Sequence, residues 1–250
     1  MDAAPGVSGD RSVDGAYEAE HLAHLATAAR AWLELPTPGQ ACPSAGCGSS
    51  RHLPDEDLEG PKKNAKRQRK LIVFADESGL SEKPSIRRTW GAKGTTPIVV
   101  HSQRWSKLSM MAALMYHWSG TPFALTFEII DGSYDTDRIK RWGRRLVRFL
   151  AGRPAILVWD RLAAHKNKAV VAYLKAHRID IEYLPSYSPH LNPTEWLWAN
   201  LKGVELANYC PDIISEAAHE ARRGIKRIKR RKESLLTGFL HGSGLTLESK

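Results

Sequence analysis

Short apolar runs separated by polar segments recur along most of the chain. Two of them, residues 71–76 (LIVFAD) and 155–160 (AILVWD), are continuous and too short for a helix, so each is expected to form a buried strand. Three further stretches, residues 106–118, 123–130 and 179–184, also have the composition of strands. The pattern therefore predicts a sheet of five strands.

Helical periodicity predicts four helices between and after these strands. One face of residues 136–150 carries apolar side chains three or four positions apart: Ile139, Trp142, Leu146 and Phe149. The other helices are expected at residues 167–177, 193–207 and 212–232. Three strands are thus followed by alternating helices and strands. This order predicts an α/β fold with a mixed five-stranded sheet and helices on both faces.

Residues 1–60 are rich in Ala, Gly and Pro and show little of this periodicity. They contain one amphipathic stretch, residues 22–32, followed by a Gly/Ser/Pro-rich loop at residues 36–50. A single helix cannot bury its own apolar face, so this region is expected to be poorly ordered or docked on the remainder. The predicted organisation is a loose N-terminal extension, residues 1–60, and one domain, residues 61–240.

The distribution of charge along the chain indicates a polyanionic partner. Residues 1–60 carry three basic and ten acidic side chains, whereas residues 61–250 carry the remaining 34 basic and 17 acidic ones. So positive a domain favours nucleic acid as the partner, although a basic surface that serves only solubility remains an alternative. Three cysteines do not make a disulfide framework, and no run approaches the length of a membrane span. We therefore expect a cytoplasmic protein that does not interact with membranes.

Two of the predicted buried strands end in a carboxylate, at Asp76 and Asp160. If these strands are adjacent and parallel, the two side chains meet at one edge of the sheet, where ligands of open α/β sheets bind. Neighbouring carboxylates repel each other, and a divalent cation such as Mg²⁺ or Mn²⁺ relieves the repulsion. A loop cap or a salt bridge is the simpler interpretation of either residue taken alone.

Glu195 is a third candidate ligand, 35 positions after Asp160. That distance suffices for a helix, a strand and a loop to return the chain to the same edge. The segment from Asn192 to Glu195 also reads as a capping box at the start of a helix, and the two interpretations are compatible. Asp76, Asp160 and Glu195 are thus predicted to hold two metal ions about 3.5–4 Å apart.

Three blocks of sequence carry a family resemblance. They begin at Phe74 (FADESGLSEKPSIRRTWGAKGTTP), Ala155 (AILVWDRLAAHKNKAVVAYL) and Ile181 (IEYLPSYSPHLNPTEWLWANLKG). Together they resemble the bacterial insertion-sequence transposases related to the mariner group, which have a DDE superfamily endonuclease domain. In that family 34 residues separate the second Asp from the Glu, as they do between Asp160 and Glu195 here. The block around Glu195 is the most specific of the three.

The resemblance implies a ribonuclease-H-like fold, Mg²⁺-dependent cleavage at transposon ends and strand transfer into target DNA during transposition. It also implies double-stranded DNA as the partner, a nucleoid-associated bacterial protein and a possible homodimer. Two departures stand out. Arg161 follows the second Asp where the family often has Asn, and residues 1–60 lack the helix-turn-helix pattern that reads transposon ends. We therefore expect a truncated or frame-disrupted element.

Several other residues have competing interpretations. Glu77 is expected to point away from Asp76 and is a weaker candidate ligand. His165 is either a group that orients a phosphate or Glu195, or a solvated polar residue. Trp90, Trp105, Trp196 and Trp198 are expected in or at the edge of the core. The last predicted helix offers candidate phosphate contacts, with a solvated helix face as the alternative: Arg222, Arg223, Lys226, Arg227, Lys229, Arg230, Arg231 and Lys232.

Three functions are compatible with these features. The first is a divalent-metal-dependent DNA endonuclease and strand transferase that moves a transposable element. The second is a catalytically silent DNA-binding relic of a transposase. The third is a ribonuclease-H-type hydrolase of RNA–DNA hybrids, which shares the metal chemistry but not the block around Glu195. The sequence favours the first.

Overall fold

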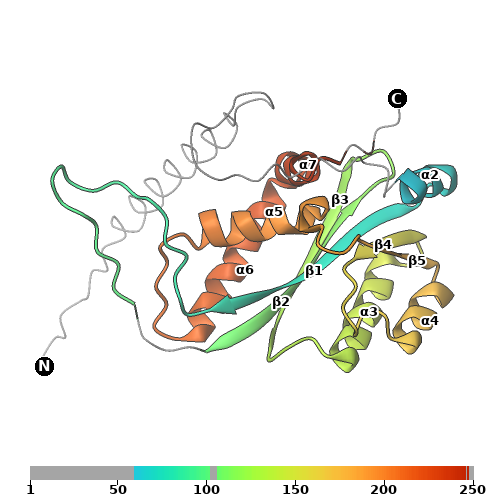
Figure 1. The fold of residues 1–250 in the computed structure, drawn as a ribbon, viewed down its shortest axis with the longest axis horizontal. Coiled ribbons are helices and arrows are strands. Elements are labelled where there is room, and N and C mark those ends of the chain that lie inside the picture. The colour runs from blue at the N-terminus through green and yellow to red at the C-terminus, as the bar shows by residue number, and fades with distance from the viewer. Residues whose placement is uncertain (1–58, 102–105, 246, 248–250) are drawn as a thin grey trace, which may run out of the picture. The chain divides into compact units, whose positions relative to one another are not determined.

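The computed structural model describes residues 59–101, 106–245 and 247, which belong to one compact unit (Figure 1). The expectations for residues 1–58 and for Trp105 lie outside the described residues. The described part begins with helix α2 (Glu59–Gln68), whose Ala65 is fully buried against the core. No helix of the described part is long and apolar enough to cross a membrane.

Five strands form one mixed sheet in the order β3-β2-β1-β4-β5. Their bounds are β1 (Leu71–Ser81), β2 (Lys107–Tyr116), β3 (Pro122–Asp131), β4 (Ala155–Trp159) and β5 (Ile179–Tyr183). The first three strands are antiparallel neighbours, whereas β4 pairs in parallel with β1 and β5 pairs in parallel with β4. The predicted mixed five-stranded sheet, with its first and fourth strands side by side and parallel, is confirmed.

Helices cover both faces of the sheet, as the alternation of side chains along its strands requires. The helices are α3 (Thr136–Leu150), α4 (Lys168–Ala176), α5 (Pro193–Asn200), α6 (Ile214–Arg230) and α7 (Lys232–Gly242). Val73 and Ala75 of β1 pack in one core cluster with α3 and α4. Ile72 and Phe74 pack in the other with α5, α6 and α7 (Figure 1).

The C-terminal helices differ from the predicted ones. The helix expected at residues 193–207 consists of α5 followed by η3 (Leu201–Glu205), one turn of π-helix. The helix expected at residues 212–232 ends at Arg230, and α7, which was not predicted, begins at Lys232. The break lets α7 fold back against α5 and β3, burying Leu236 and Leu240 in the core. Long-range packing therefore decides where these helices end.

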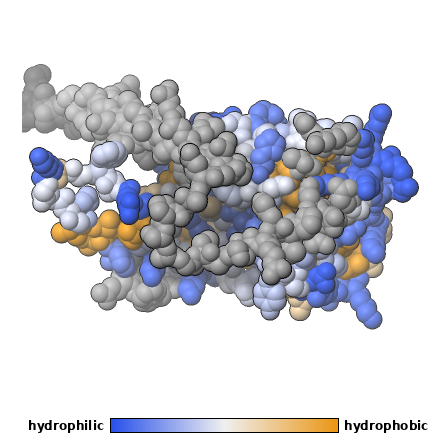
Figure 2. Space-filling view, turned by 45° about the horizontal axis from the view of Figure 1, so that its top comes forward, coloured by the Kyte–Doolittle hydropathy of each residue, from blue (hydrophilic) through white to orange (hydrophobic). Residues whose placement is uncertain are grey.

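Two large side chains that were expected in the core are exposed. Phe149 is 45% exposed, because Leu150 takes the buried position at the end of α3. Trp90 is 86% exposed, in the long connection between β1 and β2 that also exposes Ile98 and Val100. Figure 2 shows apolar atoms, in orange, on the side where Figure 1 places this connection. A single aromatic side chain in a turn-rich segment carries no periodicity, so the sequence does not determine its burial.

Candidate active site

Asp76 lies on the face of β1 that points toward α5. Its Oδ2 accepts a hydrogen bond of 3.0 Å from the indole Nε1 of Trp198, which is itself buried. Burial and the neighbouring carboxylate of Glu195 raise the pKa of Asp76 to about 7. The site therefore holds a largely buried carboxylate whose negative charge is poorly compensated.

Glu195 lies in the first turn of α5, and the cap of that helix leaves its side chain free for other contacts. The Oδ1 of Asn192 accepts from Thr194 N at 3.2 Å and Thr194 Oγ1 at 2.6 Å, so Asn192 is the N-cap, as predicted. The backbone N–H of Asn192 donates to Pro189 O instead of to Glu195. The reciprocal half of a capping box is thus absent, and the exposed Glu195 carboxylate lies near enough to Asp76 to raise its pKa.

Asp160 follows β4 directly. Phe74 of β1 pairs with Val158 of β4 in parallel register, so Asp76 and Asp160 each lie two residues past a paired position on neighbouring strands. Burial raises the pKa of the Asp160 carboxyl, but hydrogen bonds from His165 and from Leu162 N outweigh it and hold the pKa below its usual value. Asp160 is therefore an ionised carboxylate at the edge predicted for a metal site.

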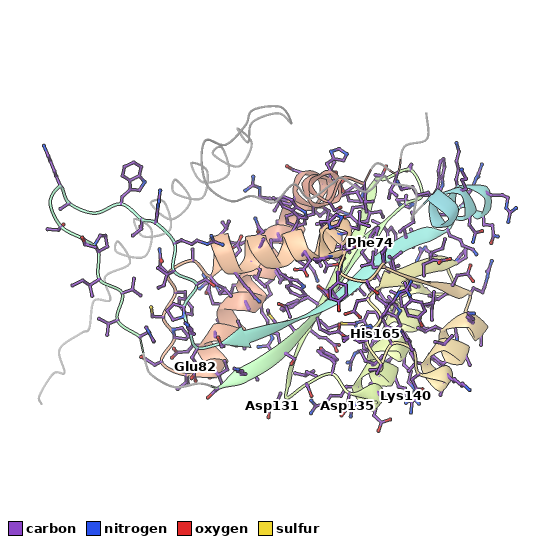
Figure 3. The ribbon with its side chains drawn as sticks, in the orientation of Figure 1. Phe74, Glu82, Asp131, Asp135, Lys140 and His165 are labelled. Atoms are coloured by element: carbon purple, nitrogen blue, oxygen red, sulfur yellow. The ribbon has the colours of Figure 1, made fainter. Side chains whose placement is uncertain are left out.

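His165 is buried, with 1% exposure, and bridges two carboxylates. Its Nδ1 lies 2.7 Å from Asp160 Oδ1, its Nε2 lies 2.9 Å from Glu77 Oε1, and its ring stacks on Trp159 at 4.0 Å. Burial lowers the pKa of His165, but the two carboxylates outweigh it and raise that pKa to about 9, so the ring donates both hydrogen bonds near neutral pH. The interpretation of His165 as a solvated residue is wrong. Figure 3 shows it on the α3 and α4 side of the sheet.

Glu77 points to the face opposite Asp76, as the strand period predicts. Its Oε2 is buried and has no hydrogen-bond partner within the described part of the chain. Glu77 therefore reaches Asp160 only through His165. The bridge explains why an acid directly after Asp76 and a His five positions after Asp160 occur together, which the sequence alone left unconnected.

Lys202 is a charged neighbour of the site that the sequence reading did not single out. It lies in η3, and its Nζ donates to Ser78 Oγ of β1 at 2.7 Å. Burial lowers the pKa of Lys202, while the carboxylates of Glu195 and Asp76 act to raise it. Lys202 is the second residue of this π-helical turn, where the chain is wound more loosely than in an α-helix, and no sequence periodicity indicates that change. One ammonium group is thus close to two of the three candidate ligands.

The carboxylates have the chemistry of a magnesium site, because hard divalent cations prefer carboxylate oxygens. Asp76 fits such a role best, since a cation would compensate the charge that burial and Glu195 leave unbalanced. Within the described residues, no group of three or more His, Cys, Asp or Glu side chains is gathered closely enough to hold a metal ion. The three predicted ligands are therefore not gathered into one cluster in this structure, although Asp76 and Glu195 are close enough to act on each other.

The predicted DNA-contacting residues of the C-terminal helices fall into two groups. Arg227 bridges Glu205 and Glu220, Arg223 pairs with Glu220, and Lys232 lies near Glu233. Arg227 therefore ties α6 to η3. The others are exposed: Arg222, Lys226, Lys229, Arg230 and Arg231. Of these, residues 222, 226 and 230 are four positions apart and share one face of α6.

The fold is α/β with an acid at the end of two neighbouring strands, and comparison with known families identifies the class of protein. The family model described as DDE superfamily endonuclease matches residues 71–213. The chain belongs to this family. A comparison with curated proteins gave no match.

Solved structures of a transposase resemble the chain. The mariner Mos1 paired end complex with Mg is 18% identical, with a TM-score of 0.50 over 96% of this chain and 82% of that one. The Mos1 paired-end complex with the left transposon end has the same identity and coverage and a TM-score of 0.49. The isolated Mos1 catalytic domain matches 74% of this chain and 90% of its own length, with 18% identity and a TM-score of 0.44. The likeness to the Mg complex supports the predicted ribonuclease-H-like fold.

Proposed function

We propose that this chain is the catalytic part of a DNA transposase, in which Asp76, Asp160 and Glu195 hold two divalent metal ions, Mg²⁺ or Mn²⁺. The observation that carries the proposal is the parallel pairing of β1 with β4. This pairing brings Asp76 and Asp160 to equivalent positions on adjacent strands, while α5 presents Glu195 to Asp76.

Each of the three acids is positioned differently for holding the metal ions. When bound, a pair of divalent ions activates a water molecule or a 3′-hydroxyl and stabilises the leaving oxygen of the phosphodiester. Asp76 is oriented by the Trp198 indole, and Asp160 is oriented by His165 and by Leu162 N. Glu195, which carries no capping hydrogen bond, completes the set from the first turn of α5.

The proposed DNA reaction is cleavage at transposon ends followed by transfer of the 3′ ends into target DNA. Membership of the DDE superfamily endonucleases supports the cleavage step. The similar Mos1 structure is a paired end complex with Mg, which supports Mg²⁺ and double-stranded DNA at transposon ends as ligands here. A paired complex of ends also supports a homodimer, and we propose a nucleoid-associated bacterial protein.

A DNA-binding relic is the second candidate function. The exposed basic face of α6 would serve a protein that holds DNA without cutting it. The described structure favours catalysis over this alternative, because a buried carboxylate beside a second one is costly to keep unless it binds something.

The test is nicking of a supercoiled plasmid in Mg²⁺ or Mn²⁺, wild type beside Asp160→Asn, with binding to nonspecific duplex DNA followed in parallel. We expect metal-dependent nicking by the wild type and at least about a 100-fold slower rate for the variant, since it loses a ligand charge at the metals. DNA binding is expected to change little. Asp131→Asn, at the exposed end of β3, is the matched control.

Nicking that survives in Asp160→Asn would rule out the proposed metal site. Binding without nicking in the wild type would favour the relic. Preferential nicking of RNA–DNA hybrids over duplex DNA would instead favour a ribonuclease-H-type hydrolase.

A further inference from the structure

A cavity of about 260 Å³ adjoins the candidate active site. It lies where β1 continues past Asp76, with Gly79 of that strand, Lys83 just beyond it, Lys202 of η3 and Tyr209 in its wall. Figure 1 shows β1 and β2 extending beyond the other strands alongside α6. Pockets for drug-sized ligands start at about 300 Å³, so this one suits a single nucleotide unit and excludes a duplex.

Lys202 connects the cavity to the candidate catalytic acids. Its Nζ is held by Ser78 Oγ at 2.7 Å, two residues along β1 from Asp76, while the side chain also lines the cavity. Asp76 and Glu195 are close enough to act on its charge. A strand of DNA whose scissile bond lies at these acids would therefore pass directly by the Lys202 ammonium.

Two further cations come from the segment that follows β1. Lys83 is exposed and lines it, and the guanidinium of Arg87 lies over Gly203, where an added Cβ would be only 2.8 Å from Nη2. The segment that carries both is fixed against the loop after η3, because Arg87 N donates to Asn208 Oδ1 at 2.8 Å and Asn208 N donates to Ser85 O at 3.0 Å. The segment that carries Lys83 and Arg87 is thus held in place by contacts of its own backbone.

The acidic groups of α6 and the Glu205 carboxylate of η3 are mostly compensated. Glu205 and Glu220 are paired with Arg227. The Glu216 carboxylate accepts a hydrogen bond from Asp212 N at 2.9 Å. The charged side chains that line the cavity are Lys83 and Lys202, so its lining is positive.

We propose that this cavity is a subsite for one nucleotide of the DNA strand that is cut, in which Lys202 and Lys83 bind the phosphodiester next to the scissile one. Tyr209 forms the apolar wall for the attached sugar or base. The assignment rests on the proposed endonuclease function, because the scissile bond defines which phosphodiester is bound. Lys202 is a positioning residue for that strand.

The test uses the full chain and compares Lys202→Gln, Lys202→Arg and Lys83→Gln with the control Lys175→Gln, an exposed lysine of α4. The first measurement is plasmid nicking with Mn²⁺. The second is the salt dependence of affinity for a fluorescein-labelled single-stranded oligonucleotide in EDTA, which needs no catalysis. Thermal unfolding checks that each variant is folded.

Loss of one charge-assisted contact is expected to lower nicking about 10-fold in Lys202→Gln and in Lys83→Gln, with Lys202→Arg recovering most of it. Each Gln variant should also reduce the slope of log K against log[salt] by about 0.7, the value for one phosphate contact to a single strand. Lys175→Gln should match the wild type in both measurements.

The outcomes separate the subsite from the proposed function. If the wild type nicks but Lys83→Gln behaves as the control and no slope changes, the subsite is overturned and Lys202 serves only as a counter-ion to Asp76 and Glu195. If the wild type does not nick but both slopes fall, Lys202 and Lys83 bind a phosphate of single-stranded DNA, but the endonuclease assignment fails and with it the placement of that phosphate next to a scissile bond. Neither nicking nor a change in slope would overturn both.

Discussion

At the scale of single residues, the carboxylates of the site differ in how well their negative charge is balanced by neighbouring groups. Asp160 has a cationic hydrogen-bond partner in His165, whereas the half-buried Asp76 lies beside Glu195 and its hydrogen bonds come from neutral donors, the Trp198 indole and the Glu77 backbone. Buried charges are tolerated when something balances them. The stability of the metal-free chain should therefore depend on the protonation of Asp76.

Replacing Asp76 with Asn should stabilise the metal-free protein at pH 8. The pKa of Asp76 is raised from 3.8 to about 7 by burial and Glu195, so its contribution to stability is present below pH 3.8 and is lost as the pH rises through about 7. At one pKa unit per ~1.4 kcal/mol, the ionised group costs up to about 4 kcal/mol at pH 8. Thermal unfolding in EDTA measures this as a higher Tm for the variant.

The gain should shrink as the pH is lowered from 8 to 5, and Asp131→Asn, an exposed acid, should show no gain at any pH. Addition of Mg²⁺ should stabilise the wild type more than Asp76→Asn. A variant that is no more stable than the wild type at pH 8 in EDTA would mean that the Asp76 charge is already compensated.

Replacing His165 with Ala should destabilise the fold. The change removes the shared donor of Asp160 and Glu77 and leaves the buried Glu77 carboxylate without a partner. Because Asp160 is partly exposed and can be solvated, we expect a loss of about 2–3 kcal/mol in the free energy of unfolding, measured in urea. His219→Ala, on the exposed face of α6, should cost less than about 0.5 kcal/mol. An equal loss in the free energy of unfolding for both variants would show that the hydrogen bonds of His165 do not stabilise the fold.

At the scale of elements, the contact between α6 and η3 holds the lysine of the site in place. Gly224 of α6 lies so close to η3 that an added Cβ would be 2.8 Å from Glu205 Cβ and 2.9 Å from Leu201 Cδ1. Arg227, one turn later, bonds to the Glu205 carboxylate. A helix that cannot approach η3 this closely would displace Lys202 as well.

Gly224→Ala should therefore destabilise the chain although alanine favours helices. Overpacking against a backbone-attached Cβ is expected to cost about 1–3 kcal/mol. Gly238→Ala is the matched control, because Gly238 lies inside α7 with nothing within 4 Å of an added Cβ, and it should stabilise by up to about 1 kcal/mol. Urea unfolding of both variants gives the comparison, and the same sign for both would contradict the close contact.

Some element boundaries could be predicted from the sequence and others could not. Strands such as Ala155–Trp159 could be predicted because a continuous apolar run that is too short for a helix is typical of a buried strand. The N-cap at Asn192 could also be predicted, because the cap is a local hydrogen bond. The π-helical turn at Leu201–Glu205 could not, because it depends on packing against Gly224 and β1, which are distant in sequence.

At the scale of the whole molecule, positive charge is concentrated on exposed helix faces. Residues Arg222, Lys226 and Arg230 form a stripe along α6. Most of the other basic residues of that region are engaged by acids, as Arg227 is by Glu205 and Glu220. The stripe is therefore the set of exposed basic residues of α6 that lie together on one face, where a DNA backbone could contact all three.

Changing Arg222, Lys226 and Arg230 together to Gln should weaken binding to duplex DNA and reduce the slope of log K against log[salt] by about 2.7, or about 0.9 for each phosphate contact. Fluorescence anisotropy at several salt concentrations measures the slope. The control removes the same charge from an exposed stripe of α3, at Arg141, Arg144 and Arg148. An equal reduction in both triple variants would indicate a general effect of net charge and no specific DNA-binding face.

The five strands, the mixed sheet and the two acids at strand ends could be predicted from the sequence, because they follow from local hydrophobic patterns and from the order of elements. The surroundings of the acids, in contrast, depend on tertiary packing. The burial of Asp76, the bridge from Glu77 through His165 to Asp160, and the position of Lys202 join residues from 88 to 124 positions apart. Such contacts depend on how strands and helices pack, and packing leaves no period in the sequence.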